Sequence, residues 1–332
     1  MWGAECLKIR TVTTATDWRK LQMKRMSVVT TLAVALGSIG SGCALAENPT
    51  DNLLGADSGK LHLTAGFSDL EGAGGGGLVP LAFITGYGSN QSWGANAHFT
   101  NIQLRNLHLF TYGVAVGALD RVELSATRQQ LDITSGPLDG LGVMQDVYGV
   151  KVKLFGDAIY GQDSFLPQVS VGAQYKHNDG IKHGEAVGLA GVINPQQLGA
   201  QAEHSTDFYL ALTKVFLGES VLVNAVVRET KANQFGLLGF GGDRHRGYST
   251  KPEGTVAYLV TRRLAVGGEI RTGPHNLGID DQGNGWTLFV GWTPTKNLSL
   301  VAAYLNIGSV LGPVTHVTRH QDGPYLSVQA GF

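Results

Sequence analysis

The chain has 332 residues, of which 43% are hydrophobic and 15% charged, and its formal net charge at pH 7 is −1. This balance lacks the basic excess of a nucleic-acid-binding protein, so we expect no nucleic-acid partner. The two cysteines, Cys6 and Cys43, both lie near the N-terminus, which excludes a disulfide framework or a thiolate metal site in the rest of the chain.

The N-terminal residues predict an export signal. Lys24 and Arg25 form a basic flank, residues 28–39 are apolar, and Ala44-Leu45-Ala46 fits the small-residue pattern of a cleavage site. The apolar run is shorter than the roughly 20 residues that a spanning helix needs. We therefore expect cleavage after Ala46 and a mature chain that has 19 basic and 24 acidic residues, or a formal charge of −5.

Two alternatives concern this N-terminal region. Residues 1–22 form an upstream extension of the signal, and translation could begin instead at Met23 or Met26. Processing as a lipoprotein at Cys43 is the weaker alternative, because Gly40 stands where that motif usually has Leu. The predicted organisation is signal and extension over residues 1–46, a short segment over 47–58 and one domain over 59–332.

Alternation of apolar and polar residues predicts strands in this domain. Tyr148, Val150, Val152 and Leu154 share one face, whereas Lys151 and Lys153 lie on the other; similar alternation occurs in residues 169–176, 221–228 and 286–293. No stretch after Ala46 is apolar enough for a spanning helix, whereas a closed barrel satisfies all its backbone groups in lipid. An all-β fold, a transmembrane antiparallel β-barrel, is therefore predicted, with a soluble β-sandwich as the alternative.

The C-terminus favours the barrel over the sandwich. Leu326, Val328, Ala330 and the terminal Phe332 share one face of a final amphipathic strand. Such an ending resembles the assembly signal of outer-membrane proteins, so the expected location is the bacterial outer membrane. The expected partners are outer-membrane lipid and the barrel-assembly machinery.

Counting strands between turns gives twelve. The turns lie at Gly117–Asp120, Phe155–Leu166, Leu217–Ser220, Thr261–Arg263 and Thr293–Asn297. Single strands at Lys60–Phe67 and Pro324–Phe332 complete an even number, as single-chain bacterial barrels require, with both termini in the periplasm. The external loops are then Ser68–Gln103, Asp132–Asp146, His177–Thr206, Lys231–Glu253, Gly273–Asn284 and Ile307–Gly323. An additional strand pair, Leu78–Tyr87 with Asn96–Gln103, would give fourteen.

Several segments carry a family resemblance. The stretch GKLHLTAGFSDLEGAGGGGLVPLAFITGYG that begins at Gly59, together with GVAVGALDRVELSATRQQ, TKANQFGLLGFGGD and the closing YLSVQAGF, is similar to the proteobacterial domain of unknown function 3034 family. The resemblance covers nearly all of the mature chain and implies an envelope β-barrel. It implies no activity and no functional residue.

Two predicted external loops are unusually apolar. The glycine-rich run Glu71–Gly77 leads into apolar residues instead of the Gly-Lys-Ser/Thr of a phosphate-binding loop. The apolar residues of the two loops are Leu78, Val79, Leu81 and Phe83, and Phe235, Leu237, Leu238 and Phe240. Exposed apolar patches usually mark an interaction, so these loops either fold over or into the barrel mouth, or pack on each other.

The strand register places a set of charges in the lumen: Lys60, Arg121, Glu123, Lys151, Lys153, Lys176, Arg228, Glu269 and Arg271. Basic residues outnumber acidic ones in this set. One interpretation is that the charges pair within a blocked lumen. The other is a cationic constriction that favours anions, because rings of Lys or Arg line anion pores.

Three function classes remain open. The favoured one is a narrow channel or uptake protein for a small or apolar solute, and the second is a structural or adhesive barrel. The third, a lipid hydrolase, would need a His–Ser pair such as His108 and Ser125, and no Gly-x-Ser-x-Gly motif is present. The ten histidines show no metal-ligand spacing, so the sequence predicts no enzyme, no catalytic residue, no metal and no cofactor.

Overall fold

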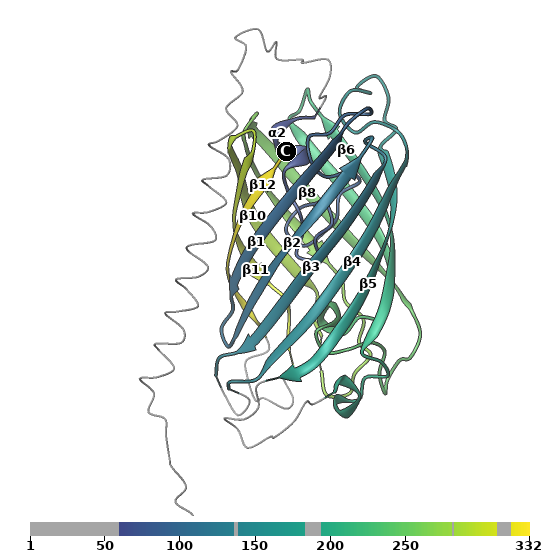
Figure 1. The fold of residues 1–332 in the computed structure, drawn as a ribbon, viewed down its shortest axis with the longest axis vertical. Helices are drawn as coiled ribbons and strands as arrows, with labels where there is room; N and C mark the ends of the chain where they lie inside the picture. The colour runs from purple at the N-terminus through teal and green to yellow at the C-terminus, as the bar shows by residue number, and fades with distance from the viewer. Residues whose placement is uncertain (1–59, 136–138, 183–193, 281, 311–319) are drawn as a thin grey trace, which may run out of the picture. The chain divides into compact units, whose positions relative to one another are not determined.

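The computed structural model describes residues 60–135, 139–182, 194–280, 282–310 and 320–332. Twelve antiparallel strands form a closed barrel in which each strand pairs with its sequence neighbours and the last pairs with the first (Figure 1). The strands are β1 (Trp93–Gln103), β2 (Leu107–Ala118), β3 (Val122–Ile133), β4 (Gly142–Phe155), β5 (Gln168–Lys182), β6 (His204–Phe216), β7 (Val221–Thr230), β8 (Ser249–Thr261), β9 (Leu264–Arg271), β10 (Gly285–Thr295), β11 (Leu298–Asn306) and β12 (Asp322–Gly331). The predicted fold class and strand number are confirmed.

The described helices are short: α2 (His62–Ala65), η2 (Pro195–Leu198) and η3 (Asn233–Gly236). No helix in the described part of the chain is long and apolar enough to cross a membrane.

The two ends of the barrel differ in their connections. At one end, here the turn end, the strands are joined through residues 119–121, 156–167, 217–220, 262–263 and 296–297. The C-terminal Phe332 and the start of β1 also lie at this end, since Ala95 pairs with Phe332 through two backbone hydrogen bonds of 2.7 and 2.9 Å. The opposite end, the loop end, carries most of the longer connections. In outer-membrane barrels the short turns are periplasmic.

The first predicted strand was wrong. Lys60–Phe67 contains helix α2, and the first strand is β1, which the prediction had placed inside the external loop Ser68–Gln103. The fourteen-strand alternative was wrong as well, because Leu78–Tyr87 forms no strand of the barrel. The physical reason is closure: β1 pairs with β2 on one edge and β12 on the other, so no free edge remains for an additional strand.

The outer face of the wall is apolar and edged by aromatic side chains. On β10, Trp286, Leu288, Val290 and Trp292 are all exposed, whereas Thr287 between them is buried inside. The two tryptophans lie toward opposite ends of the barrel, as expected of the aromatic girdles at the two interfaces of a membrane.

The strands at the loop end are longer than predicted. The prediction assigned Asp132–Asp146 to a loop, but β3 continues to Ile133 and β4 begins at Gly142. Beyond the apolar band the outward positions are polar too, as in the pair of Arg128 with Asp146 at 2.6 Å. Alternation between apolar and polar residues therefore ends before the strands do.

Candidate functional site: a plug in the lumen

Residues 60–88, here called the plug, lie inside the barrel and are not part of its wall (Figure 1). Leu70, Leu78, Val79 and Ala82 of the plug are at most 1% exposed. The plug therefore fills space that an open channel would leave to water.

The two limbs of the plug meet at the turn end. The Gly86 N–H donates to the Ala65 carbonyl at 2.8 Å, and the Tyr87 hydroxyl donates to the His62 carbonyl at 3.0 Å. Lys60 donates to the carbonyls of Ile84 and Gly86 at 2.7 and 3.0 Å. These contacts join residues 60–66 to residues 84–87 into one base.

Charge and burial also shape this base. Burial lowers the pKa of Lys60, and its ion pair with Asp120 at 3.1 Å opposes that shift. Burial raises the pKa of Tyr87 to about 12. The Tyr87 hydroxyl therefore stays protonated at neutral pH, and the ion pair with Asp120 stabilises the Lys60 ammonium at the rim.

Charged side chains of the wall bind the plug backbone deeper in the lumen. The Glu269 carboxylate accepts hydrogen bonds from the N–H groups of Gly77 at 2.9 Å and Leu78 at 2.7 Å. Glu123 accepts one from Gly74 at 2.8 Å, and Lys151, its ion-pair partner at 3.1 Å, donates to the Gly74 carbonyl at 2.8 Å. Side chains of the wall thus supply the hydrogen-bond partners that a neighbouring strand supplies to backbone groups within a β-sheet.

Uncharged wall side chains complete this pattern. Gln129 and Thr111 donate to the Leu70 carbonyl at 2.7 and 3.1 Å, and Ser170 donates to the Ala82 carbonyl at 2.6 Å. The Ala82 N–H is held by Thr213, the Pro80 carbonyl by Asn224, and the Ser68 N–H by Gln329. Buried backbone groups are costly when unpaired, so these contacts, spread over most of the strands, stabilise an irregular segment inside the barrel.

Glycines permit the close approach between plug and wall. A Cβ atom on Gly76 would lie 1.8 Å from Glu269 Oε1, and one on Gly72 would lie 1.9 Å from Thr127 Oγ1. Gly72 also has a φ of +89°, which L side chains rarely adopt. The glycine-rich run is thus part of a packed contact with the wall.

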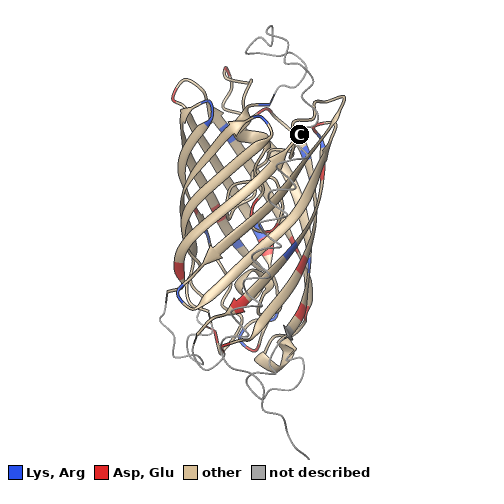
Figure 2. Cartoon of the chain, turned by 60° about the vertical axis from the view of Figure 1, so that its left-hand side comes forward, with Lys and Arg blue, Asp and Glu red and all other residues tan. Residues whose placement is uncertain are grey.

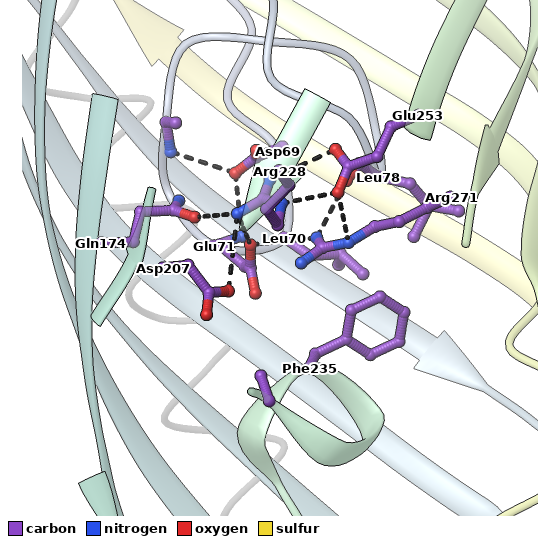
Figure 3. A network of polar contacts seen from close by, with 12 residues as sticks. Asp69, Leu70, Glu71, Leu78, Gln174, Asp207, Arg228, Phe235, Glu253 and Arg271 are labelled. Carbon is purple, nitrogen blue, oxygen red and sulfur yellow. Dashed lines mark hydrogen bonds and ion pairs between the residues drawn. The ribbon is translucent and has the colours of Figure 1, made fainter. Parts of the chain in front are cut away.

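The deepest part of the plug enters a buried charge network (Figure 3). The Glu71 carboxylate pairs with Arg271 at 2.9 Å, with Arg228 at 3.4 Å and with Lys176. Asp207 pairs with Lys176 at 2.7 Å and Arg228 at 3.7 Å, and Glu253 pairs with Arg228 at 2.5 Å and Arg271 at 3.2 Å. Three cations and three carboxylates therefore neutralise one another, and Glu71 is the carboxylate that the plug contributes.

Neutral groups fix the orientation of the two arginines. Arg228 donates to Gln174 Oε1 at 2.6 Å and lies 5.2 Å from the centre of the Tyr209 ring. The Phe235 ring of η3 lies 4.6 Å from the Arg271 guanidinium carbon, on the side away from Glu253 in Figure 3.

Lys and Arg residues in Figure 2 are visible inside the barrel as well as at its rims.

The structure places the predicted lumen charges in two groups. Glu123, Lys151, Lys176, Arg228, Glu269 and Arg271 are buried inside the barrel and in contact with the plug. Lys153 lies at the turn end, where it pairs with Asp120 at 2.6 Å.

Two of the placements were wrong. Lys60 is on the plug and not on a strand, because its segment has no free strand edge to join. Arg121 is an exposed residue of the turn between β2 and β3, where it donates to the Leu154 carbonyl at 3.2 Å. A tight turn ends the strand alternation before this position.

Three acidic members of the network were not predicted from the sequence: Glu71, Asp207 and Glu253. Glu71 was read as part of a loop, and Glu253 stood at the end of another. Asp207 could have been found, because it is in phase with the inward Tyr209, Ala211 and Thr213 of β6.

The apolar residues of the two predicted mouth loops are buried. Leu78 and Val79 belong to the same apolar cluster as Phe235, Leu237 and Leu238, and Phe240 is 1% exposed. Leu81 and Phe83 belong to a second cluster nearer the turn end, with Ile159, Val215 and Leu222. These eight apolar side chains therefore pack inside the barrel.

The structure does not bring the candidate hydrolase pair together. Ser125 is inward and 8% exposed, whereas His108 is on the outer face, hydrogen-bonded to Asn101 at 3.0 Å. Among the described residues, no group of three or more His, Cys, Asp or Glu side chains could hold a metal ion.

The predicted assembly signal forms the outer face of β12. Leu326, Val328 and Phe332 are 60%, 47% and 67% exposed, and Ala330 lies in phase with them. Pairing of β12 with β1 closes the barrel, so the terminal residues complete the sheet and leave no free edge.

These features define a class. A closed antiparallel barrel with an apolar, aromatic-edged exterior and a polar interior is an outer-membrane β-barrel. Within that class the chain belongs to the DUF3034 family, proteins of unknown function, whose model matches residues 64–329.

Several solved structures match the chain at low identity. The KdgM porin is 10% identical with a TM-score of 0.42, over 71% of this chain and 99% of that one. Omp33 of Acinetobacter baumannii is 10% identical with a TM-score of 0.35, over 74% and 99%. Outer membrane phospholipase A from Escherichia coli is 10% identical with a TM-score of 0.36, over 71% and 92%. No curated protein matches the chain.

Proposed function

We propose that the protein is a gated channel of the outer membrane for a small polar solute, and that the plug is its gate. The observation that carries this proposal is the position of the plug's two limbs. Both lie at the turn end, joined by the hydrogen bond between Gly86 and Ala65. The plug can therefore leave the lumen toward the periplasm without any part of it crossing the wall.

The chemistry of the wall supports the same proposal. The groups that hold the plug are hydroxyl, amide, carboxylate and ammonium groups, such as Thr111, Gln129, Glu123 and Lys151. Water can take over hydrogen bonds of this kind when the plug leaves, whereas an exposed apolar lining would gain no partner. Hydrogen-bonding groups of this kind suit a polar solute better than an apolar one.

The described residues correspond to a closed state. On the loop-end side of the charge network, a cavity of about 10 Å³ is lined by Arg228, Phe235 and Arg271. This volume holds at most about one water molecule. Passage of a solute therefore requires the plug to move.

A reversible disulfide tests the gate. A Cβ atom on Gly66, in the plug base, would lie 3.8 Å from Cβ of Ser299 on β11, which is a normal spacing for a disulfide. We expect the variant Gly66→Cys/Ser299→Cys to lose its channel openings when oxidised, because the fixed base keeps the rim closed. Reduction should restore the openings in the same planar-bilayer recording.

A matched pair within the wall serves as the control. A Cβ atom on Gly149 would lie 3.7 Å from Cβ of Ser125, and neither residue belongs to the plug. Oxidised Gly149→Cys/Ser125→Cys should open as often as the wild type. Equal opening of the oxidised plug-to-wall variant, or a wild type that never conducts, would contradict the proposal.

A further inference from the structure

The three wall cations Lys176, Arg228 and Arg271, here called the clamp, converge on one carboxylate. Glu71 pairs with all three, and it is fully buried. Each arginine presents several N–H donors in a plane, a geometry that suits a carboxylate better than a spherical ion or a neutral group. The clamp is thus a ready-made carboxylate site that the plug occupies.

The wall acids that pair directly with the clamp do not neutralise it. These acids are Asp207 and Glu253, so the three cations face two carboxylates once Glu71 is removed. Charges that line a confined space in a protein attract an opposite charge more strongly than they would in bulk water. Withdrawal of the plug therefore leaves a cationic site that another anion would stabilise.

The clamp is held in position without help from Glu71. Gln174 and Glu253 fix the Arg228 guanidinium, and Phe235 covers that of Arg271. Because these partners come from the wall and from η3, the cations stay oriented for a ligand after the plug leaves.

The clamp borders a water-sized cavity on the side opposite to the plug. The cavity next to Arg228 and Arg271 is lined by Pro274 and Gln282 of the connection between β9 and β10, which lies at the loop end. Glu71 reaches the same cations from the turn end. A solute that arrives through the loop end and the plug therefore compete for one set of cations.

We infer that the clamp is a binding site for the carboxylate group of a small acidic solute, and that such a solute displaces Glu71 and so releases the plug. This inference rests on the proposed gating function and adds the chemical class of the solute. A ligand shifts a conformational equilibrium only by its differential affinity for the two states, and here that difference arises because Glu71 blocks the site in the closed state.

Chemical rescue tests the carboxylate site without any transport measurement. Glu71→Ala removes a carboxymethyl group, the equivalent of an acetate, and propionate presents the same carboxylate on a chain one carbon longer. Sodium propionate should therefore raise the thermal unfolding midpoint of this variant in detergent. Propionamide, which has the same size and no charge, and sodium chloride at equal ionic strength should not raise it. The rescue should be absent in Glu71→Ala/Arg271→Gln. Equal effects of propionate and propionamide would overturn the site.

The wild-type channel provides the second measurement, which does not depend on folding of a variant. Propionate added at the loop-end side should raise the opening frequency more than ten-fold over propionamide, about the effect of 1.4 kcal/mol of differential binding. Equal opening frequencies would overturn the solute assignment. If the wild type never opens but propionate rescues Glu71→Ala, the gating function is refuted and the carboxylate site is supported.

Discussion

Deletion of residues 68–85 is expected to convert the closed barrel into one that conducts continuously. Phe67 and Gly86 can be rejoined by a short Gly-Ser linker, because the neighbouring Ala65 and Gly86 are already joined by a 2.8 Å hydrogen bond. No residue of the deleted segment belongs to a wall strand, so the sheet should close as before. Water then hydrates the polar wall groups that held the plug.

The measurement is single-channel conductance in planar bilayers, with heat-modifiable gel migration as the check that the barrel has folded. We expect long, steady openings in the deletion variant and brief ones in the full chain. A folded deletion variant that conducts no more than the full chain would mean that the plug is not what closes the lumen.

The second large effect concerns Arg228, the cation with most partners in the network. Arg228→Met leaves the carboxylates of Glu71, Asp207 and Glu253 with one cation fewer, in a site where Arg228 is 1% exposed. Removing one member of a buried ion pair typically costs 3–5 kcal/mol, so we expect a loss of about that size in the free energy of unfolding.

Arg128→Met is the matched control. Arg128 makes two hydrogen bonds of 2.6 Å to Asp146, a better pair geometry than several in the lumen, but its side chain is 41% exposed on the outer face. Exposed pairs contribute about 0–1 kcal/mol. Urea unfolding of both variants from lipid vesicles should show a large difference; equal losses would mean that burial does not set the strength of the lumen network.

The sequence predicted those features that depend on local alternation. The outward positions of β4 and β10, the closing strand with Phe332, and the five turns follow from period-two patterns and turn residues. The strand number was predicted correctly for a partly wrong reason, since Lys60–Phe67 was counted in place of β1.

The plug could not be predicted in this way. Its backbone groups are paired with side chains far away in the sequence, such as Gln329 with Ser68 and Glu269 with Leu78. Nothing in the local pattern of Glu71–Gly77 distinguishes an external loop from a segment packed against the lumen wall. The pairing of Glu71 with the clamp likewise depends on closure of the barrel around it.

The candidate site was therefore found only in part. The basic residues Lys176, Arg228 and Arg271 were placed correctly on inward positions because each lies in phase with its strand. The predicted excess of basic residues had two causes. The acids Glu71, Asp207 and Glu253 were overlooked, and the set included Lys60, Arg121 and Lys153, which lie at the turn end. The network that holds the plug is electrically balanced once the three acids are included.

The occupancy of the lumen in a membrane can be measured directly at Ser170, a wall residue whose hydroxyl donates to the Ala82 carbonyl of the plug and which is 0% exposed. The described residues contain no cysteine, so Ser170→Cys in a chain with Cys6 and Cys43 replaced is a unique label site. The measurement is the rate at which a water-soluble thiol reagent labels this cysteine in vesicles. If the plug fills the lumen, labelling of the full chain should be more than an order of magnitude slower than labelling after deletion of residues 68–85, because the reagent reaches the cysteine only when the plug opens. Equally fast labelling of the two proteins would contradict the account.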